Sequence, residues 1–329
     1  MKEITKKEFT GIFKEEFENF LRYKNALGYY KKIEGNLLYD YLALNRFLDS
    51  YKLEEIALTE EMTFAYVKTA EHLSQSTRHH RECNIRQFAK FLKSQGYENI
   101  YIQYDCTVKM PRDYIPYVFE MKRIFSVIDS RESAYDRYDS RLFYQTLIRL
   151  LYCTGLRLGE ALELKISDID FTDNIIIVNS GKGNVSRLVP FKASLSKWLI
   201  NYNRKKSKPG DTYFFESPSG DRRCNHSITT TFRKNILPKA GVSLASVNGH
   251  SRGPCIHSLR HTFACNALDQ MIKEGKDPYC ALPYLSVYLG HTDITNTEIY
   301  LRLTMERYDE VINVGHYIYE RVLGGGSDD

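Results

Sequence analysis

The chain has 329 residues, 43% of them hydrophobic, so it is long enough to bury two cores, and we expect two domains. Its formal charge is only +5, which by itself does not establish a polyanionic partner. No stretch approaches the roughly 18 apolar residues of a membrane span, and the first residues lead into charged sequence rather than an apolar signal core. These features exclude a membrane protein and predict a soluble, cytoplasmic one.

Seven cysteines are scattered along the chain without a CxxC pair. An odd and widely spaced set argues against a disulfide framework and against a cysteine zinc site. We therefore expect reduced thiols in or near the cores.

The first part of the chain is nearly free of glycine and proline from residue 7 to residue 95. Apolar residues recur there at helical spacing, as in Phe13, Phe17 and Leu21. This pattern predicts a small all-helical domain over residues 1–108.

The last helix of that domain carries cations mostly off its apolar stripe of Ile85, Phe88 and Leu92. Residues 77–94 hold five cations against one glutamate, and residues 181–208 hold eight cations and no acidic residue. Two basic stretches in two domains could grip a polyanion from two sides, although each alone is more often a solvated surface. The candidate DNA-contacting residues are Arg78, Arg81, Arg86, Lys90, Lys93 and Arg187.

Pro111 and Pro116 interrupt a segment without apolar periodicity, which favours an extended linker. We place this linker at residues 109–116 and the second domain at residues 117–323. The glycine-rich residues 324–329 predict a flexible tail.

The second domain is predicted to be mostly helical with a small sheet. Residues Arg141–Cys153 form a strongly apolar segment closed by Gly155, which predicts a helix, and a shorter helix is predicted over Leu158–Leu164. Arg157 would lie where this short helix begins.

Two short runs, Ile175–Val178 and Arg187–Pro190, predict the strands of an antiparallel hairpin. The glycine-flanked turn Gly181–Asn184 between them would present Lys182 at its tip. Alone, this pattern is simply a hairpin turn.

The candidate catalytic groups suit the attack of a tyrosine hydroxyl on a phosphodiester. A phenol with a pKa near 10 needs cations to stabilise its anion, and guanidinium groups stabilise the charge that develops on phosphate oxygens in the transition state. A lysine can protonate the leaving 5′ oxygen, and histidines can donate to the phosphate or accept a proton. The set is Arg157, Lys182, His257, Arg260, His291 and Tyr300.

Local sequence around Tyr300 distinguishes it from the other 24 tyrosines. Gly290 can end one helix, and Thr295 with Glu298 matches a capping box that starts the next. His291 would then lie in the turn, with Tyr300 in the second turn of the new helix. Tyr288 and Tyr308 are the nearest rivals, and a separate apolar pattern predicts a final helix over residues 305–323.

A metal site is the alternative for His257, His261 and Cys265, which share one face of a helix. No HExxH glutamate accompanies them, and His261 can equally pack or cap. We therefore expect no metal and no cofactor.

Four segments, TGLRLGEAL, GKGNVSRLVP, HSLRHTFA and LGHTDITNTEIYLR, resemble the motif blocks of the tyrosine recombinase (phage integrase) family in order and spacing. The resemblance covers residues 117 to about 310. Its ordered pattern matches the six candidate residues and adds Glu160 as a structural partner of the site.

The resemblance implies a SAM-like helical core-binding domain that closes around DNA and a catalytic domain of the DNA breaking-rejoining fold. It implies that Tyr300 forms a 3′-phosphotyrosine bond without metal or ATP. Double-stranded DNA and a homo-tetramer on synapsed sites, assembled from monomers or weak dimers, are the implied partners, with room for accessory or partner recombinases. The final helix could dock on a neighbouring subunit or pack on its own domain.

Three other activities stay open from the sequence. A type IB topoisomerase-like or telomere-resolving enzyme would use the same chemistry. A non-catalytic DNA-binding factor with the same fold would retain Tyr300 without needing it. The compact length and the residues of the four motif segments favour a recombinase of a mobile element or of a chromosome-dimer resolution system.

Overall fold

The computed structural model describes residues 8–29, 37–105, 117–130, 138–179, 186–204, 210–245, 253–291 and 293–305. The chain divides into two compact units, Met1–Arg112 and Asp113–Asp329. The predicted linker, the turn with Lys182, the final helix and the tail lie outside the described residues.

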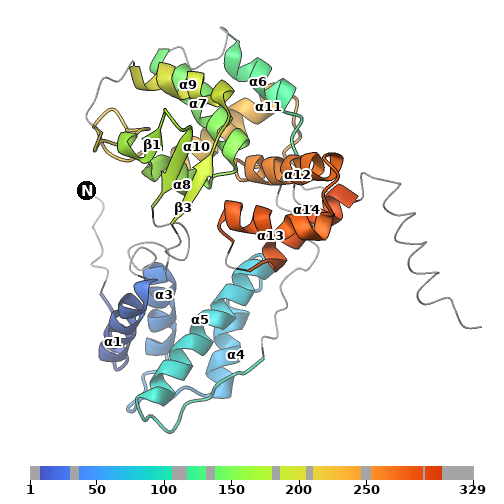
Figure 1. The fold of residues 1–329 in the computed structure, drawn as a ribbon. Coiled ribbons are helices and arrows are strands. Elements are labelled where there is room, and N and C mark those ends of the chain that lie inside the picture. Colours follow the sequence, from blue (N-terminus) through green and yellow to red (C-terminus); the bar gives the residue numbers. More distant parts are fainter. Residues whose placement is uncertain are drawn as a thin grey trace, which may run out of the picture. The chain divides into compact units, whose positions relative to one another are not determined.

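The first unit is built from helices, as Figure 1 shows in blue to turquoise. Its four main helices are α1 (Lys14–Lys24), α3 (Leu38–Asp49), α4 (Glu60–Lys68) and α5 (Gln75–Ser94). Thr59 and Ser74 begin α4 and α5, because their hydroxyl oxygens accept hydrogen bonds from backbone amides in the first turn. Gly96, with φ of +95°, follows the end of α5, close to the predicted terminus.

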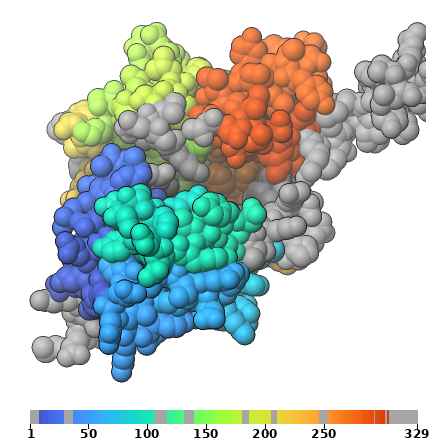
Figure 2. All heavy atoms as spheres, turned by 90° about the horizontal axis from the view of Figure 1, so that it is seen from below, coloured from blue at the N-terminus to red at the C-terminus, as the bar shows by residue number. Residues whose placement is uncertain are grey.

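Aromatic side chains fill the core of this unit. The rings of Phe17 and Phe88 stack with centroids 3.9 Å apart, and Phe20 packs edge-on against Tyr41. All four side chains are almost fully buried. Figure 2 draws the heavy atoms as spheres, with the helices of this unit in blue to turquoise, and the buried rings lie beneath that surface. The helical spacing of Phe13 and Phe17 in the sequence is thus explained by core packing, since Phe13 is also buried.

The second unit is mainly helical, with one small sheet, as the sequence predicts. The helices of its first half are α6 (Met121–Asp129), α7 (Tyr138–Thr154), α8 (Leu158–Glu163) and α9 (Ala193–Arg204). Those of its second half are α10 (Asn225–Thr231), α11 (Leu237–Lys239), α12 (Ser258–Lys273), α13 (Pro278–Leu289) and α14 (Thr295–Met305).

The sheet has three antiparallel strands in the order β1 (Ile169–Asp170), β2 (Ile175–Val178) and β3 (Arg187–Pro190). The predicted hairpin is confirmed, with Ile176 opposite Val189. Strand β1 is only two residues long and was not predicted from the sequence.

Two apolar clusters hold the second unit together. The larger one gathers α6, α7, α8, the sheet and residues up to Leu259, and the smaller one joins α12, α13 and α14. Helix α12 packs on α7, α13 and α14, so the two clusters meet along it. The described helices include none that is both long and apolar enough to cross a membrane.

Candidate active site

Arg157 stands at the start of α8, as predicted. The backbone turns just before it at Gly155, which has a φ of +61°, a conformation that glycine adopts at low cost. A side chain would not fit there either, because a Cβ would lie 2.5 Å from the ring of Phe263. The Arg157 guanidinium donates to Glu160 through Nη1 at 2.7 Å and to the carbonyl of Gly290 through Nη2 at 3.3 Å. Its side chain is 22% exposed, so the guanidinium can still reach a ligand.

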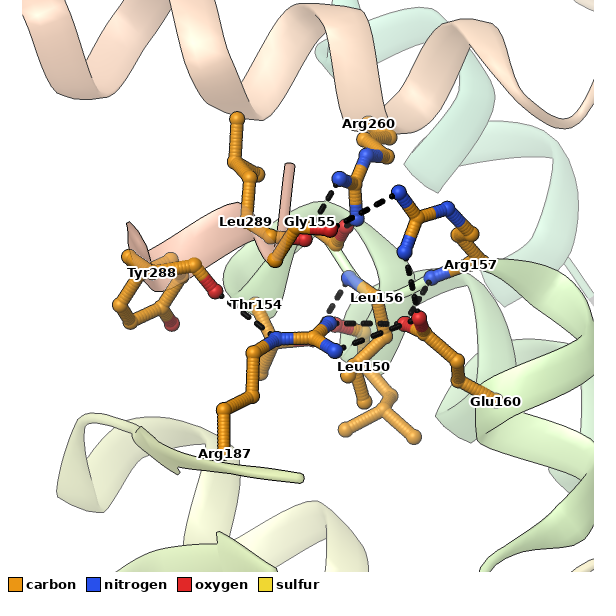
Figure 3. Close-up of polar contacts among 11 residues, drawn as sticks. Leu150, Thr154, Gly155, Leu156, Arg157, Glu160, Arg187, Arg260, Tyr288 and Leu289 are labelled. Carbon is orange, nitrogen blue, oxygen red and sulfur yellow. Dashed lines mark hydrogen bonds and ion pairs between the residues drawn. The ribbon is translucent and has the colours of Figure 1, made fainter. Parts of the chain in front are cut away.

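Arg260 lies in the first turn of α12 and is 2% exposed. Its Nη1 donates to the Gly155 carbonyl at 2.8 Å and its Nη2 to the Leu289 carbonyl at 2.6 Å (Figure 3). Burial, followed by the neighbouring charge of Arg157, lowers the pKa of Arg260 to about 10. The group therefore remains a cation at neutral pH, fixed beside Arg157.

Glu160 lies in the first turn of α8, beside Arg157. It accepts hydrogen bonds from the backbone and side chain of Arg157 and from Arg187. Burial alone would raise the pKa of this carboxyl group, but the hydrogen bonds from Arg187 and Arg157 outweigh it and lower the pKa to about 2. Glu160 is consequently an anion between two cations.

Arg187 lies in the interior, which disagrees with the DNA-contacting role predicted for it from the sequence. Its side chain is 7% exposed and pairs with Glu160 at 2.8 Å. The alternation of β3 explains this placement, because Arg187 shares a face with the buried Val189 while Leu188, between them, is 61% exposed. The period of two was the signal that could have identified an inward-facing arginine.

His291 lies in the turn between α13 and α14, as predicted. Gly290 ends α13 in the left-handed conformation, with φ of +67°. The Nδ1 atom of His291 is 2.8 Å from the Thr297 hydroxyl. Burial, followed by the charges of Arg260 and Arg157, lowers the pKa of His291 to about 4, so its ring is neutral at pH 7.

The start of α14 differs in detail from the predicted capping box. The carboxylate of Asp293, rather than the hydroxyl of Thr295, accepts a backbone hydrogen bond at 3.0 Å, from the amide of Thr295. Asp293 is an equally good cap, and it lies two residues before the first helical residue. Tyr300 still falls in the second turn of α14.

Tyr300 is 2% exposed, and its hydroxyl lies 2.9 Å from Nδ1 of His261. Its ring stacks on that of His291 with centroids 6.4 Å apart. Burial, followed by the neighbouring His257, lowers the pKa of His261 to about 3. A neutral His261 with its proton on Nε2 accepts the hydrogen bond of the phenol.

The contact of His261 with Tyr300 was not predicted from the sequence, in which His261 shares a helix face with His257 and Cys265. His257 precedes the first turn of α12, is exposed, and places its ring 4.9 Å from that of His261. Within the described part of the chain, no group of three or more His, Cys, Asp or Glu side chains is arranged to hold a metal ion.

The cations predicted to contact DNA in the first unit have mixed environments. Lys90 and Lys93 are exposed on α5. Arg81 donates to the Thr69 hydroxyl at 2.8 Å, and Arg86 donates to the Tyr104 carbonyl at 3.0 Å. Arg78 is half-buried on the same helix.

The second unit thus brings together two arginines, an exposed histidine, a neutral histidine and a tyrosine from α8, α12, the α13–α14 turn and α14. Fixed guanidinium groups beside a phenol can stabilise both a phenolate and the oxygens of a phosphate. Backbone carbonyls hold the side chains of Arg157 and Arg260 in place before any ligand binds. The arginines therefore need little reorganisation when a phosphate binds.

Comparison with known proteins identifies the family of the chain. Residues 117–307 match the model of the phage integrase family, which is more than half of the chain. The chain belongs to the phage integrase family. Curated relatives include a putative integrase/recombinase, y4rB, of Sinorhizobium fredii, with 28% identity over 92% of this chain and 96% of the relative. The tyrosine recombinase XerC of Oceanobacillus iheyensis has 28% identity over 89% of this chain and 92% of its own. This phage integrase family member is a tyrosine-type site-specific recombinase.

Solved structures show the same fold. XerH recombinase bound to its palindromic difH substrate, after cleavage, aligns with a TM-score of 0.60 and 21% identity, over 79% of this chain and 73% of that one. The Tn1549 transposon integrase bound to transposon right-end DNA aligns with a TM-score of 0.58 and 17% identity, over 85% of this chain and 97% of the integrase chain. The fold class predicted from the sequence is confirmed.

Proposed function

We propose that this recombinase cleaves and rejoins DNA strands at specific sites through a covalent 3′-phosphotyrosine bond to Tyr300. The observation that carries the proposal is the hydrogen-bonded tyrosine next to two oriented arginines, in a chain whose relatives are named as recombinases and integrases. Double-stranded DNA is the proposed substrate. The solved neighbours bound to difH and to transposon-end DNA support that choice.

In the proposed first step, the Tyr300 oxygen attacks the scissile phosphorus and the bond from phosphorus to the 5′ oxygen breaks. Arg157, Arg260, His257 and His291 would contact the phosphate oxygens. Losing one such donor generally costs a hundredfold to a thousandfold in rate, which is on the order of 3–4 kcal/mol. Lys182, outside the described residues, is the proposed donor of a proton to the leaving 5′ oxygen.

Rejoining reverses these steps. A 5′-hydroxyl of a partner strand attacks the phosphotyrosine and releases Tyr300, so bond energy is conserved and ATP is not needed. We propose that this takes place in a homo-tetramer on two synapsed sites, and that the DNA belongs to a mobile element. The Tn1549 transposon integrase, a solved neighbour bound to transposon-end DNA, supports the mobile-element proposal.

The phenol must also change its surroundings before it reacts. The Tyr300 residue is only 2% exposed and its hydroxyl lies 2.9 Å from Nδ1 of His261, so the proposed attack requires that α14 moves or that the phenol leaves His261. DNA binding could supply the free energy for this step.

The test is a labelled suicide DNA with a candidate element end and a nick beside the cleavage point, incubated with the protein in a metal chelator and analysed by denaturing electrophoresis. We expect a covalent protein–DNA band that is lost in Tyr300→Phe. Tyr284→Phe is the matched control, because that side chain is 75% exposed on α13, and it should keep the band.

Two results would contradict the proposal. Tight binding without a covalent band would favour a non-catalytic DNA-binding factor. A band that persists in Tyr300→Phe would assign the nucleophile to another tyrosine.

A further inference from the structure

The end of α13 is held by three different arginines. The carbonyl of Tyr288 accepts from Nε of Arg187 at 2.9 Å, and that of Leu289 accepts from Arg260 at 2.6 Å (Figure 3). The carbonyl of Gly290 accepts from Arg157 at 3.3 Å. The last carbonyls of a helix have no partner within the helix and carry partial negative charge. Three consecutive carbonyls thus organise three cations immediately before His291.

Arg187 also controls the carboxylate that holds Arg157. Each oxygen of Glu160 accepts one hydrogen bond from each arginine: Oε1 from Nη1 of Arg157 at 2.7 Å and Nη1 of Arg187 at 3.3 Å, and Oε2 from the amide of Arg157 at 2.9 Å and Nη2 of Arg187 at 2.8 Å. Rotation of the carboxylate would break bonds to both arginines. Its orientation is therefore fixed from two sides.

Arg187 cannot serve both this network and a phosphate. All three guanidinium nitrogens are hydrogen-bonded, and the side chain is 7% exposed. Arg157 differs from Arg187, because its side chain is 22% exposed while its guanidinium is held by Glu160 and by the Gly290 carbonyl.

We propose that Arg187 is a positioning residue of the active site, which holds Glu160 and the end of α13 so that the guanidinium of Arg157 faces the scissile phosphate. This inference rests on the proposed function. Its electrostatic reason is that Arg157 and Arg260 repel each other. Glu160, the terminal carbonyls of α13 and the Gly155 carbonyl oppose that repulsion. The single negative charge of Glu160 and the roughly half negative charge at the end of α13 do not balance the three positive arginines. The site therefore keeps a net positive charge that attracts a phosphate.

The position of Arg187 on β3 adds a second connection. It pairs with Val178 in the last register of the hairpin, beside residues 180–185, which contain the predicted Lys182. The hydrogen bonds of Arg187 therefore tie the base of that hairpin to α8 and to α13. One side chain thus links the start of α8 at Arg157, the strands that flank Lys182 in the sequence, and the end of α13 before His291.

The test measures the rate of covalent-complex formation on the suicide DNA at saturating protein, together with DNA affinity and the thermal midpoint. Arg187→Lys keeps the buried charge opposite Glu160 but cannot make the bidentate contact and the Tyr288 contact together. We expect it to bind DNA within about threefold of the wild-type affinity and to cleave roughly 100-fold more slowly, the cost of a misplaced group. Arg123→Lys is the control, because Arg123 is 61% exposed and pairs with Glu120 in the same unit.

A double-mutant cycle with Arg157→Lys separates positioning from general stability. If Arg187 acts through Arg157, the double variant should cleave within about threefold of the slower single variant. Multiplying effects, or cleavage by Arg187→Lys at the wild-type rate, would overturn the inference. Arg187→Gln is the second variant, and loss of folding in both would mark a residue needed only for stability. Failure of the unmodified chain to form any covalent complex would instead overturn the proposed function, and this inference with it.

Discussion

Replacing Glu160 with glutamine tests the centre of the arginine network. The carboxylate accepts four hydrogen bonds, two on each oxygen, and a carboxamide retains one acceptor oxygen while its NH₂ group faces donors. Two charge-assisted bonds are lost, each worth about 1.5–3 kcal/mol, and Arg187 remains buried without its counter-charge. We expect a loss of about 3–5 kcal/mol in the free energy of unfolding, in line with other broken buried ion pairs.

The assay is thermal unfolding at pH 7 followed by circular dichroism. For a unit of this size, each kcal/mol shifts the midpoint by about 2–4 °C, so the second unit of Glu160→Gln should unfold roughly 10 °C lower. Glu163→Gln on the same helix is the matched control, since Glu163 is 39% exposed and its Arg222 partner is 3.7 Å away. A change within about 1 kcal/mol of that control would refute the reasoning that the pair is buried and fully engaged.

Three further variants test separate features. Gly290→Ala should lower the free energy of unfolding by about 1 kcal/mol more than Gly275→Ala. Both glycines have positive φ, but only at Gly290 would a Cβ lie 3.0 Å from the buried Arg187. Equal melting midpoints of the two variants would contradict this. His261 has a pKa of about 3 when folded, below the usual value of about 6.5, so its contribution to stability is complete above pH 6.5 and is lost as the pH falls toward 3, by up to about 1.4 kcal/mol per pH unit. Urea unfolding between pH 7 and 4 should show a shallower acid loss in His261→Gln, and parallel curves would exclude this origin. We expect α5 to face DNA, so Lys90→Gln should lower the log–log slope of DNA affinity against salt concentration by about one unit. Lys68→Gln on α4, at a position that is also exposed, is the control and should leave that slope unchanged.

Local signals in the sequence located most of the secondary structure near the site. Glycine at positions 155 and 290 ends helices because only a residue without Cβ adopts these left-handed conformations at low cost. The two short runs on either side of the glycine-containing turn were predicted as strands, and their antiparallel pairing is observed. The error at the start of α14 was small, because Asp293 and Thr295 both have side chains that can cap a helix.

The sequence by itself determined which residue types are present for phosphate chemistry, in which order, and on which local elements. It could not decide which cations are free, because exposure depends on packing between segments far apart in the chain. Arg187 and Glu160 are 27 residues apart, and Arg157 and Gly290 are 133 apart. Only the tertiary structure brought the end of α13 against three arginines and placed Tyr300 on His261, since backbone carbonyls and a buried imidazole carry no signature in the sequence that names their partner.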